Sequence, residues 1–181
     1  MLIARLKWRL GRMKTPICTF CLKSGVLCSR CQEKIEKGEV SDLDIKVAKR
    51  LVELEERFSS LKDVKFVKAV ESNNLIVIVV GEGDTPNLVG PKGRVIKSLS
   101  EELGNKKIRI VEETSPLKKT IEDIISPVSL LGVNTVWLPD GSNEKKVRIR
   151  QSESKKLPAP TQVLEKLIYD LTGERVRFVF E

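Results

Sequence analysis

Hydrophobic residues recur every three or four positions after residue 42, and this spacing predicts an amphipathic helix. The apolar positions of that helix are Val47, Leu51, Leu54, Phe58 and Leu61. Ser41 precedes them and has the short hydroxyl side chain that is preferred at an N-cap. We therefore expect a helix that begins after Ser41 and buries one face.

Two apolar runs follow this helix and predict a pair of strands. They cover residues 64–70 and 75–83, and the Ser72-Asn73-Asn74 stretch between them is typical of a turn. The second run contains LIVIVV, which is apolar on both faces and therefore favours a central position in a sheet.

A short helix, a longer helix and a strand complete this part of the chain. Asp84 or Thr85 can cap the short helix, because Pro86 follows in its first turn. The longer helix is closed by Gly104, and KKIRIVEE after it reads as a strand. The predicted order of this module is αββααβ.

The same order recurs, with altered details, over residues 114–181. VIKSLSEELGNKKIRIVEE at 95–113 aligns without gaps with VLEKLIYDLTGERVRFVFE at 163–181, an offset of 68 residues. Upstream, Ser115-Pro116 opens a helix and a Pro-Asp-Gly turn joins two strands. The sequence thus predicts an α+β protein in which a second, altered copy follows the first module.

Charge is concentrated at the front of the chain. The net charge of +8 comes from 33 basic and 25 acidic residues, and the first 32 residues hold seven bases and no acid. A nucleic acid backbone or an anionic membrane favours such a segment. The chain has no histidine, which argues against imidazole-based hydrolysis, and only 4% aromatic residues, which argues against binding surfaces made of stacked aromatic rings.

The first 16 residues read as a basic amphipathic arm. Leu2, Leu6, Leu10 and Met13 fall on one helical stripe, with arginines beside it. The arm fits RNA, an anionic membrane or the protein's own body, and its basic surroundings favour RNA. The longest apolar run is too short to span a bilayer and no secretory signal is evident, so we expect a cytoplasmic protein with no membrane span.

Four cysteines lie within residues 17–40 as C-x2-C-x6-C-x2-C: Cys18, Cys21, Cys28 and Cys31. Each C-x2-C pair can direct two thiolates to one point, and the Ser24-Gly25 turn can fold one pair back on the other. We therefore predict a small structural Zn²⁺ module. Two disulfides or an iron–sulfur cluster are the alternatives.

A Gly-x-x-Gly loop stands between the short and the longer predicted helix, with the sequence LVGPKGRVIKSL. A helix N-terminus offers unpaired amides, and glycines allow a phosphate backbone to approach them. Lys92 lies between the two glycines, and Arg94 and Lys97 follow. The simpler alternative is a glycine-rich helix entry with a structural role only.

This order and the motif LVGPKGRVIKSLSEELG resemble the KH domain in its prokaryotic (type II) arrangement, most closely the KH modules of NusA-like transcription factors. The resemblance implies single-stranded RNA held across the loop, about four nucleotides at a time. It further implies that the RNA-binding residues are Gly90, Pro91, Lys92, Gly93, Arg94 and Lys97. NusA-like proteins carry tandem KH modules, and in the second module QSESKKLPAPTQ replaces the loop without any glycine.

The resulting division of the chain is an arm over 1–16, a zinc module over 17–40, a KH domain over 41–113 and a degenerate KH-like domain over 114–181. The expected function is a non-enzymatic RNA-binding factor that acts in transcription elongation or on nascent or ribosomal RNA. An adaptor that docks on the ribosome or RNA polymerase is the alternative. A metal-dependent nuclease is weaker, because its candidate carboxylates do not form a convergent motif: Glu101, Glu102, Asp140 and Glu144.

Overall fold

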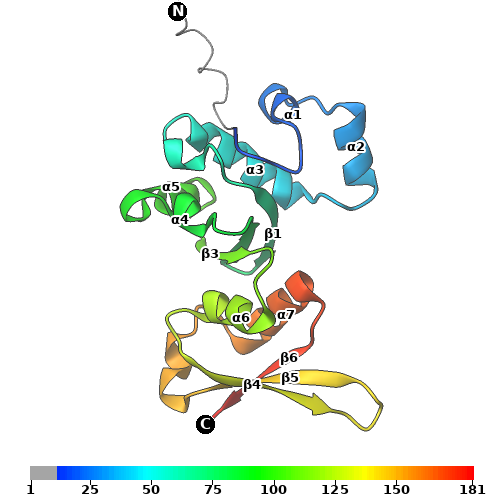
Figure 1. Cartoon of the computed structure of the whole chain (residues 1–181), viewed down its shortest axis with the longest axis vertical. Helices are drawn as coiled ribbons and strands as arrows, with labels where there is room; N and C mark the ends of the chain where they lie inside the picture. Colours follow the sequence, from blue (N-terminus) through cyan, green and yellow to red (C-terminus); the bar gives the residue numbers. More distant parts are fainter. Residues whose placement is uncertain (1–11) are drawn as a thin grey trace, which may run out of the picture. The chain divides into compact units, whose positions relative to one another are not determined.

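The computed structural model describes residues 12–181, which fold into two compact units (Figure 1). One unit holds the chain up to residue 68 together with residues 80–105. The other holds residues 69–79 and 106–181. No helix of the described residues is long and apolar enough to cross a membrane.

The first unit contains the helices that were expected after Ser41 and beside the Gly-x-x-Gly loop, together with two short helices at the cysteines. Its α-helices and 3₁₀ helices (η) are α1 (Thr19–Ser24), α2 (Ser29–Glu36), α3 (Asp42–Glu55), η1 (Ser59–Leu61), α4 (Thr85–Val89), η2 (Pro91–Gly93) and α5 (Arg94–Glu102). The Ser41 side chain accepts the N–H of Asp44 and the Asp44 carboxylate accepts the N–H of Ser41, so the predicted cap of α3 is confirmed as a full capping box.

Helix α3 is shorter than its apolar spacing predicted. It ends at Glu55, and the chain turns so that the N–H groups of Arg57 and Phe58 both bond to the carbonyl of Leu54. Phe58 is extended, and η1 then carries Leu61 into the core, where it is fully buried. A turn and a 3₁₀ helix therefore preserve the three-residue spacing that resembled a continuous helix.

The core of the first unit forms where α3, η1, α4 and α5 contact one another. The side chains that fill it are Leu51, Leu54, Leu61, Leu88, Val95 and Leu99, all fully buried. Their packing fixes the end of α4 against the start of α5, and the Gly-x-x-Gly loop lies between these two helices.

The segment that enters the first unit is extended where it is described. Lys14 donates its N–H to the carbonyl of Val64 at 2.9 Å and accepts the N–H of Phe66 at 2.8 Å, so it pairs in parallel beside Lys65. Met13 and Ile17 are buried. Residues 12–16 are therefore not helical, and the rest of the predicted arm lies outside the described residues.

A three-stranded sheet follows, in the order β1-β2-β3. Its strands are β1 (Phe66–Ser72), β2 (Leu75–Val80) and β3 (Lys107–Glu112). Every residue of β2 is buried, which confirms the central position that its two apolar faces predicted. Asn73 has a φ of 54° in the predicted turn, a conformation that asparagine tolerates better than most residues.

The second unit repeats the αββααβ pattern in its C-terminal part. Its elements there are α6 (Leu117–Ile125), β4 (Leu130–Trp137), β5 (Asn143–Ile149), η3 (Gln151–Lys156), α7 (Thr161–Thr172) and β6 (Val176–Phe180). Strand β5 pairs antiparallel with β4 and parallel with β6. Helices α6 and α7 cover one face of this sheet, and alternate residues such as Val147 and Ile149 are buried (Figure 1).

The offset of 68 residues is reproduced by the elements themselves. Moving α5 and β3 forward by 68 places them within about two residues of the bounds of α7 and β6 at every end. In both sheets the strands also lie side by side in the order in which they occur along the chain. The predicted α+β class is confirmed, whereas the boundaries of the four predicted domains remain predictions.

Candidate functional sites

The four cysteines converge on one point. Their sulfur atoms all lie within 4.8 Å of one another, and none of the four forms a disulfide. The Cys18 and Cys21 sulfurs are 3.2 Å apart, and those of Cys18 and Cys31 are 3.7 Å apart. Four sulfurs that hold a metal at about 2.3 Å in a tetrahedron are about 3.8 Å apart, so the cluster matches the size of such a site.

Two short helices bring the sulfurs together. Cys18 and Cys28 are the N-cap residues of α1 and α2, and Cys21 and Cys31 lie one turn further on. Gly25, at a φ of 73°, ends α1 in the left-handed conformation that reverses the chain towards α2. Each C-x2-C pair is thus built on a helix start, and the two pairs converge on one point as the spacing predicted.

The two pairs are also linked to each other by N–H···S hydrogen bonds. Cys28 donates its N–H to the Cys21 sulfur at 3.1 Å, and Cys18 donates its N–H to the Cys31 sulfur at 3.5 Å. The N–H of the first cysteine in one pair therefore bonds to the second cysteine of the other. Such donors stabilise negative charge on sulfur and favour thiolate ligands.

The thiols of the cluster differ in acidity. Hydrogen bonds from the Cys31 N–H and from neighbouring thiols lower the pKa of Cys28 to about 7, and the Cys21 N–H and thiol lower the pKa of Cys18. The pKa of Cys21 rises to about 12, since burial and its neighbouring thiols outweigh the Cys28 N–H that lowers it. Burial is the main cause that raises the pKa of Cys31. Four thiolates this close repel one another unless a cation lies among them.

The cluster can therefore hold a metal ion with four protein ligands. Four thiolates fill the tetrahedral coordination of such an ion and leave no open position for a substrate or water. The arrangement fits a structural role, and the Cys18, Cys21, Cys28 and Cys31 set is the only group of three or more metal-binding side chains that residues 12–181 bring together.

The Gly-x-x-Gly loop connects α4 to α5. Gly90 has φ 74° and ψ 176°, Lys92 has φ 54° and ψ 29°, and Gly93 has φ 70° and ψ 17°. Three of its four residues thus have a positive φ, which disfavours most side chains. This run of positive φ values turns the chain from α4 directly into the first turn of α5.

Gly90 is required by packing as well as by its backbone conformation. A Cβ atom at this position would lie 2.3 Å from Cγ2 and 2.9 Å from Cβ of Val95. Val95 is fully buried in the first turn of α5 and cannot move away without disturbing the core. The glycine therefore allows the loop to lie directly on the start of the helix.

The start of α5 presents the amides of its first turn and positive charge, although the N–H groups of Gly93 and Arg94 already donate to the carbonyls of Gly90 and Pro91. No side chain caps the helix, and neither the loop nor the first turn contains an acidic residue. Lys92, Arg94 and Lys97 are exposed, and within the described part of the chain none of them forms an ion pair. The amides, the helix dipole and the three cations all favour an anion at this position.

The corresponding part of the second unit is different. Residues 151–156 form η3, and α7 begins after Pro160 without a glycine or a residue of positive φ. Lys155 and Lys156 are exposed, and Lys156 lies 3.9 Å from Glu153. This connection retains positive charge but lacks the bare backbone of the first loop.

Three of the four carboxylates considered for a nuclease have other partners. Asp140 accepts hydrogen bonds from the N–H and hydroxyl of Ser142, which lower its pKa and stabilise a turn. Glu144 lies 3.6 Å from Arg177, and Glu102 lies 3.9 Å from Arg57. These contacts are typical of turns and solvated ion pairs.

A groove beside α1 was not predicted from the sequence. It lies between α1 and the end of α3 and exposes the ring of Phe20, whose side chain is 71% exposed. An exposed phenylalanine has no local signal in the sequence, because the cysteine spacing alone does not determine which of the intervening residues are buried.

Three comparisons place this geometry among known proteins. Residues 42–113 match the family model of the NusA-like first KH domain. The expected resemblance is thereby confirmed for this stretch, which contains α3, the first sheet and the Gly-x-x-Gly loop. Residues 42–113 are therefore similar to a KH domain of the NusA-like type, and a four-cysteine cluster precedes them.

A curated relative is the probable transcription termination protein NusA of Methanococcus vannielii, which is 29% identical over 93 residues. The match covers 51% of this chain and 51% of the relative, so the chain spans about half of that protein's length.

The crystal structure of APE1850 is similar in fold, with a TM-score of 0.52 at 18% sequence identity. The similar region covers 74% of this chain and 96% of the APE1850 chain. This is a larger part of the present chain than residues 42–113, so the similarity of fold extends beyond the segment that matches the KH family model.

Proposed function

We propose that the KH domain binds single-stranded RNA through Gly90, Pro91, Lys92 and Gly93, with Arg94 and Lys97 on the following helix. The observation that carries this proposal is the loop itself. Positive-φ glycines bring the backbone onto an uncapped helix start, and three exposed cations surround it without an acid. RNA phosphates are the anions that a KH loop of this kind accepts.

The loop suits a phosphate backbone more than a single base. Amides and cations at a helix start bind phosphate whatever the sequence, whereas bases need apolar or hydrogen-bonding contacts elsewhere. Pro91 has no N–H, so the loop offers one donor fewer than a loop with another residue at this position. We expect moderate affinity that falls as the salt concentration rises.

We propose that residues 114–181 are a KH-like module whose RNA-binding loop has been lost. Its αββααβ order, its strand order and the 68-residue offset support a second copy. Without glycine at residues 151–160, the backbone before α7 cannot approach a phosphate in the same way. This module then acts as a scaffold in a tandem arrangement.

We propose further that the cysteine cluster holds one structural Zn²⁺. The tetrathiolate donor set and the sulfur separations support zinc, and no redox partner motif supports an iron–sulfur cluster. Zinc would fix α1 and α2, which are too short to be stable alone.

We propose that the chain is a cytoplasmic, non-enzymatic factor that acts in transcription elongation or on nascent or ribosomal RNA. The relative named for transcription termination supports the role in transcription. Docking on the ribosome or RNA polymerase as an adaptor remains the alternative. The two functions differ in one respect: an adaptor of this kind would not bind RNA in a purified system.

Two loop variants test the proposal. Changing Pro91 and Lys92 together to Asp should weaken binding of a short single-stranded RNA by about tenfold or more, since a hydrogen bond to a charged group contributes about 1.5–3 kcal/mol. The matched control changes Lys155 and Lys156 to Asp and alters the net charge by four, against three for the loop variant. Equal losses in direct titrations would refute a special role for the loop.

A further inference from the structure

A surface groove lies where α1 meets the end of α3. It has a volume of about 490 Å³, and the chain enters the first unit along its edge at Arg12. We call it the α1–α3 groove; the residues that define it are Arg12, Phe20, Lys23, Glu55, Glu56 and Lys62. All of them belong to the first unit.

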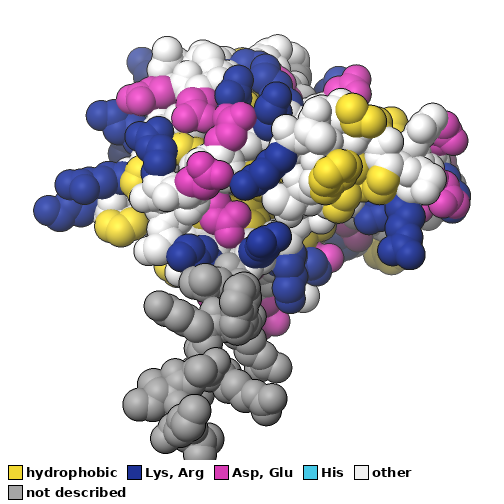
Figure 2. Space-filling view, turned by 90° about the horizontal axis from the view of Figure 1, so that it is seen from above, with side chains coloured by type: hydrophobic (Ala, Val, Ile, Leu, Met, Phe, Trp, Pro, Cys, Tyr) yellow, Lys and Arg dark blue, Asp and Glu magenta, His cyan; other side chains and the backbone are white. Residues whose placement is uncertain are grey.

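Phe20 gives this groove an unpartnered aromatic face. The next two residues of α1, Cys21 and Leu22, are buried, whereas Phe20 itself is 71% exposed. Seen from above, hydrophobic side chains reach the surface near basic ones (Figure 2). A free ring beside cations is what single-stranded nucleic acids use, because a base stacks on the ring while its phosphate meets the charge.

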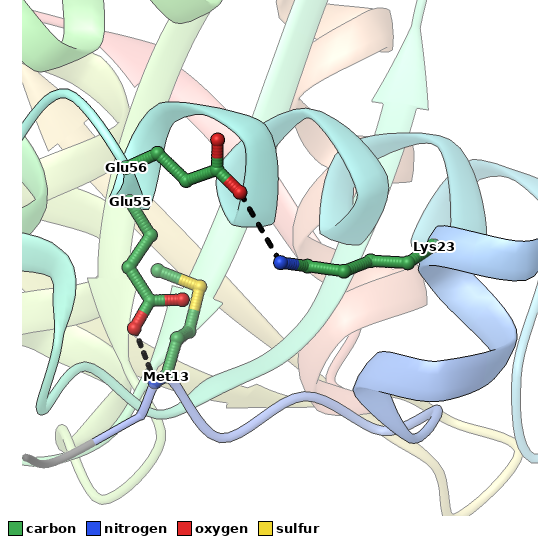
Figure 3. Close-up of polar contacts among 4 residues, drawn as sticks. All are labelled: Met13, Lys23, Glu55 and Glu56. Carbon is green, nitrogen blue, oxygen red and sulfur yellow. Dashed lines mark hydrogen bonds and ion pairs between the residues drawn. The ribbon is translucent and has the colours of Figure 1, made fainter.

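The basic residues of the groove are available to a phosphate. Neither Arg12 nor Lys62 has an acidic partner within the part of the chain that the structure describes. Lys23 pairs with Glu56 at 3.2 Å, but both side chains are largely exposed (Figure 3), and such a pair contributes little to stability. Lys23 can therefore exchange this partner for a phosphate at small cost.

Two carboxylates, Glu55 and Glu56, also line the groove. Glu55 accepts the N–H of Met13 at 3.1 Å and so holds the entering chain in place, and Glu56 follows it at the end of α3 (Figure 3). Carboxylates do not favour phosphate, but they accept hydrogen bonds from the exocyclic amino groups of bases, as Glu and Asp do with cytosine N4.

We propose that the α1–α3 groove is a subsite for one nucleotide of single-stranded RNA. The base stacks on Phe20 with its amino edge towards Glu56, and the adjoining phosphates contact Arg12 and Lys62. This goes beyond the proposed function of the KH loop, because it assigns RNA contact to the cysteine module as well.

The direct test changes Phe20 to Ala and to Tyr in the full zinc-loaded chain. Removal of one base–aromatic stack should weaken binding of a short single-stranded RNA by about 5-fold or more, since such a stack is worth about 1–3 kcal/mol. Tyrosine should retain the binding. Because Phe20 is exposed, neither variant should lose metal or helix content, which elemental analysis and circular dichroism check.

Val26 supplies the matched control. It is 68% exposed in the same cysteine module but does not line the groove. Val26→Ala should leave RNA affinity unchanged, and an equal loss in both variants would overturn the subsite in favour of a general hydrophobic contact. If Phe20→Ala binds normally while the Pro91/Lys92 double variant is impaired, the subsite is refuted and the KH function stands. If both bind normally, both proposals fail.

Photocrosslinking and base preference locate the base itself. RNA that carries 5-iodocytidine should crosslink within the tryptic peptide 15–23, which contains Phe20. Oligo(C) should bind more tightly than oligo(U), which lacks the amino group, and Glu56→Gln should reduce that ratio. A crosslink confined to other peptides, or a ratio that Glu56→Gln leaves unchanged, would contradict the proposed orientation of the base.

Discussion

Replacement of Gly90 by Ala tests how the Gly-x-x-Gly loop is built. The added Cβ would lie 2.3 Å from Cγ2 of Val95, which is fully buried, so it must displace Val95 or the loop. Gly90 also has φ 74° and ψ 176°, a region that is almost confined to glycine. The variant therefore combines backbone strain of about 1–3 kcal/mol with overpacking of about 1–3 kcal/mol.

Gly104 provides the control for this change. Its φ of 85° is also positive, but a Cβ there would meet no atom within 4 Å. Both substitutions remove the same conformational freedom from the unfolded chain, so that effect cancels when the two variants are compared. We expect Gly104→Ala to be destabilising by about 1–2 kcal/mol and Gly90→Ala by about 2–6 kcal/mol.

Urea unfolding followed by circular dichroism measures both variants against the parent protein, with metal present throughout. A chain of this length loses about 2–4 °C of Tm per kcal/mol, so a thermal scan gives a second reading of the same difference. If Gly90→Ala unfolds at the same urea concentration as Gly104→Ala, the close contact between the loop and Val95 is refuted.

Two further predictions concern the cysteine cluster and β3. The purified protein should carry one zinc per chain, and Cys21→Ser should release the zinc and unfold α1 and α2. Elemental analysis that shows iron, or mass spectrometry that shows two disulfides, would refute the zinc assignment. Arg109 is half-buried and donates to the carbonyls of Ile124 and Ser126. Arg109→Ala should therefore lower the free energy of unfolding by about 1.5–3 kcal/mol. An unchanged midpoint of urea unfolding would show that these hydrogen bonds contribute nothing to stability.

Local patterns predicted most of the elements because their causes are local. Ser41 followed by Asp44 contains a whole capping box within four residues, and LIVIVV contains both faces of a buried strand. The cysteine spacing likewise predicted that the two C-x2-C pairs converge, although not that each pair starts a helix. In each case the residues that determine the structure lie within one or two turns of each other.

What the sequence did not show depends on residues far apart along the chain. The pairing of Lys14 beside Lys65 joins segments that are separated by about fifty residues, and no periodicity encodes it. The groove around Phe20 depends in the same way on where the end of α3 lies. The early end of α3 has a different cause, since Phe58 and Leu61 keep helical spacing although no glycine or proline marks the turn.

The most direct test of RNA binding by the loop is an NMR titration of the ¹⁵N-labelled, zinc-loaded protein with a short single-stranded RNA. We predict amide shifts over residues 90–97, which include Lys92 and Arg94, and no comparable shifts over the second module's residues 151–160. Absence of shifts over residues 90–97 while the RNA binds, or equal shifts in both segments, would contradict the central claim that this loop is the RNA-binding site of the KH domain.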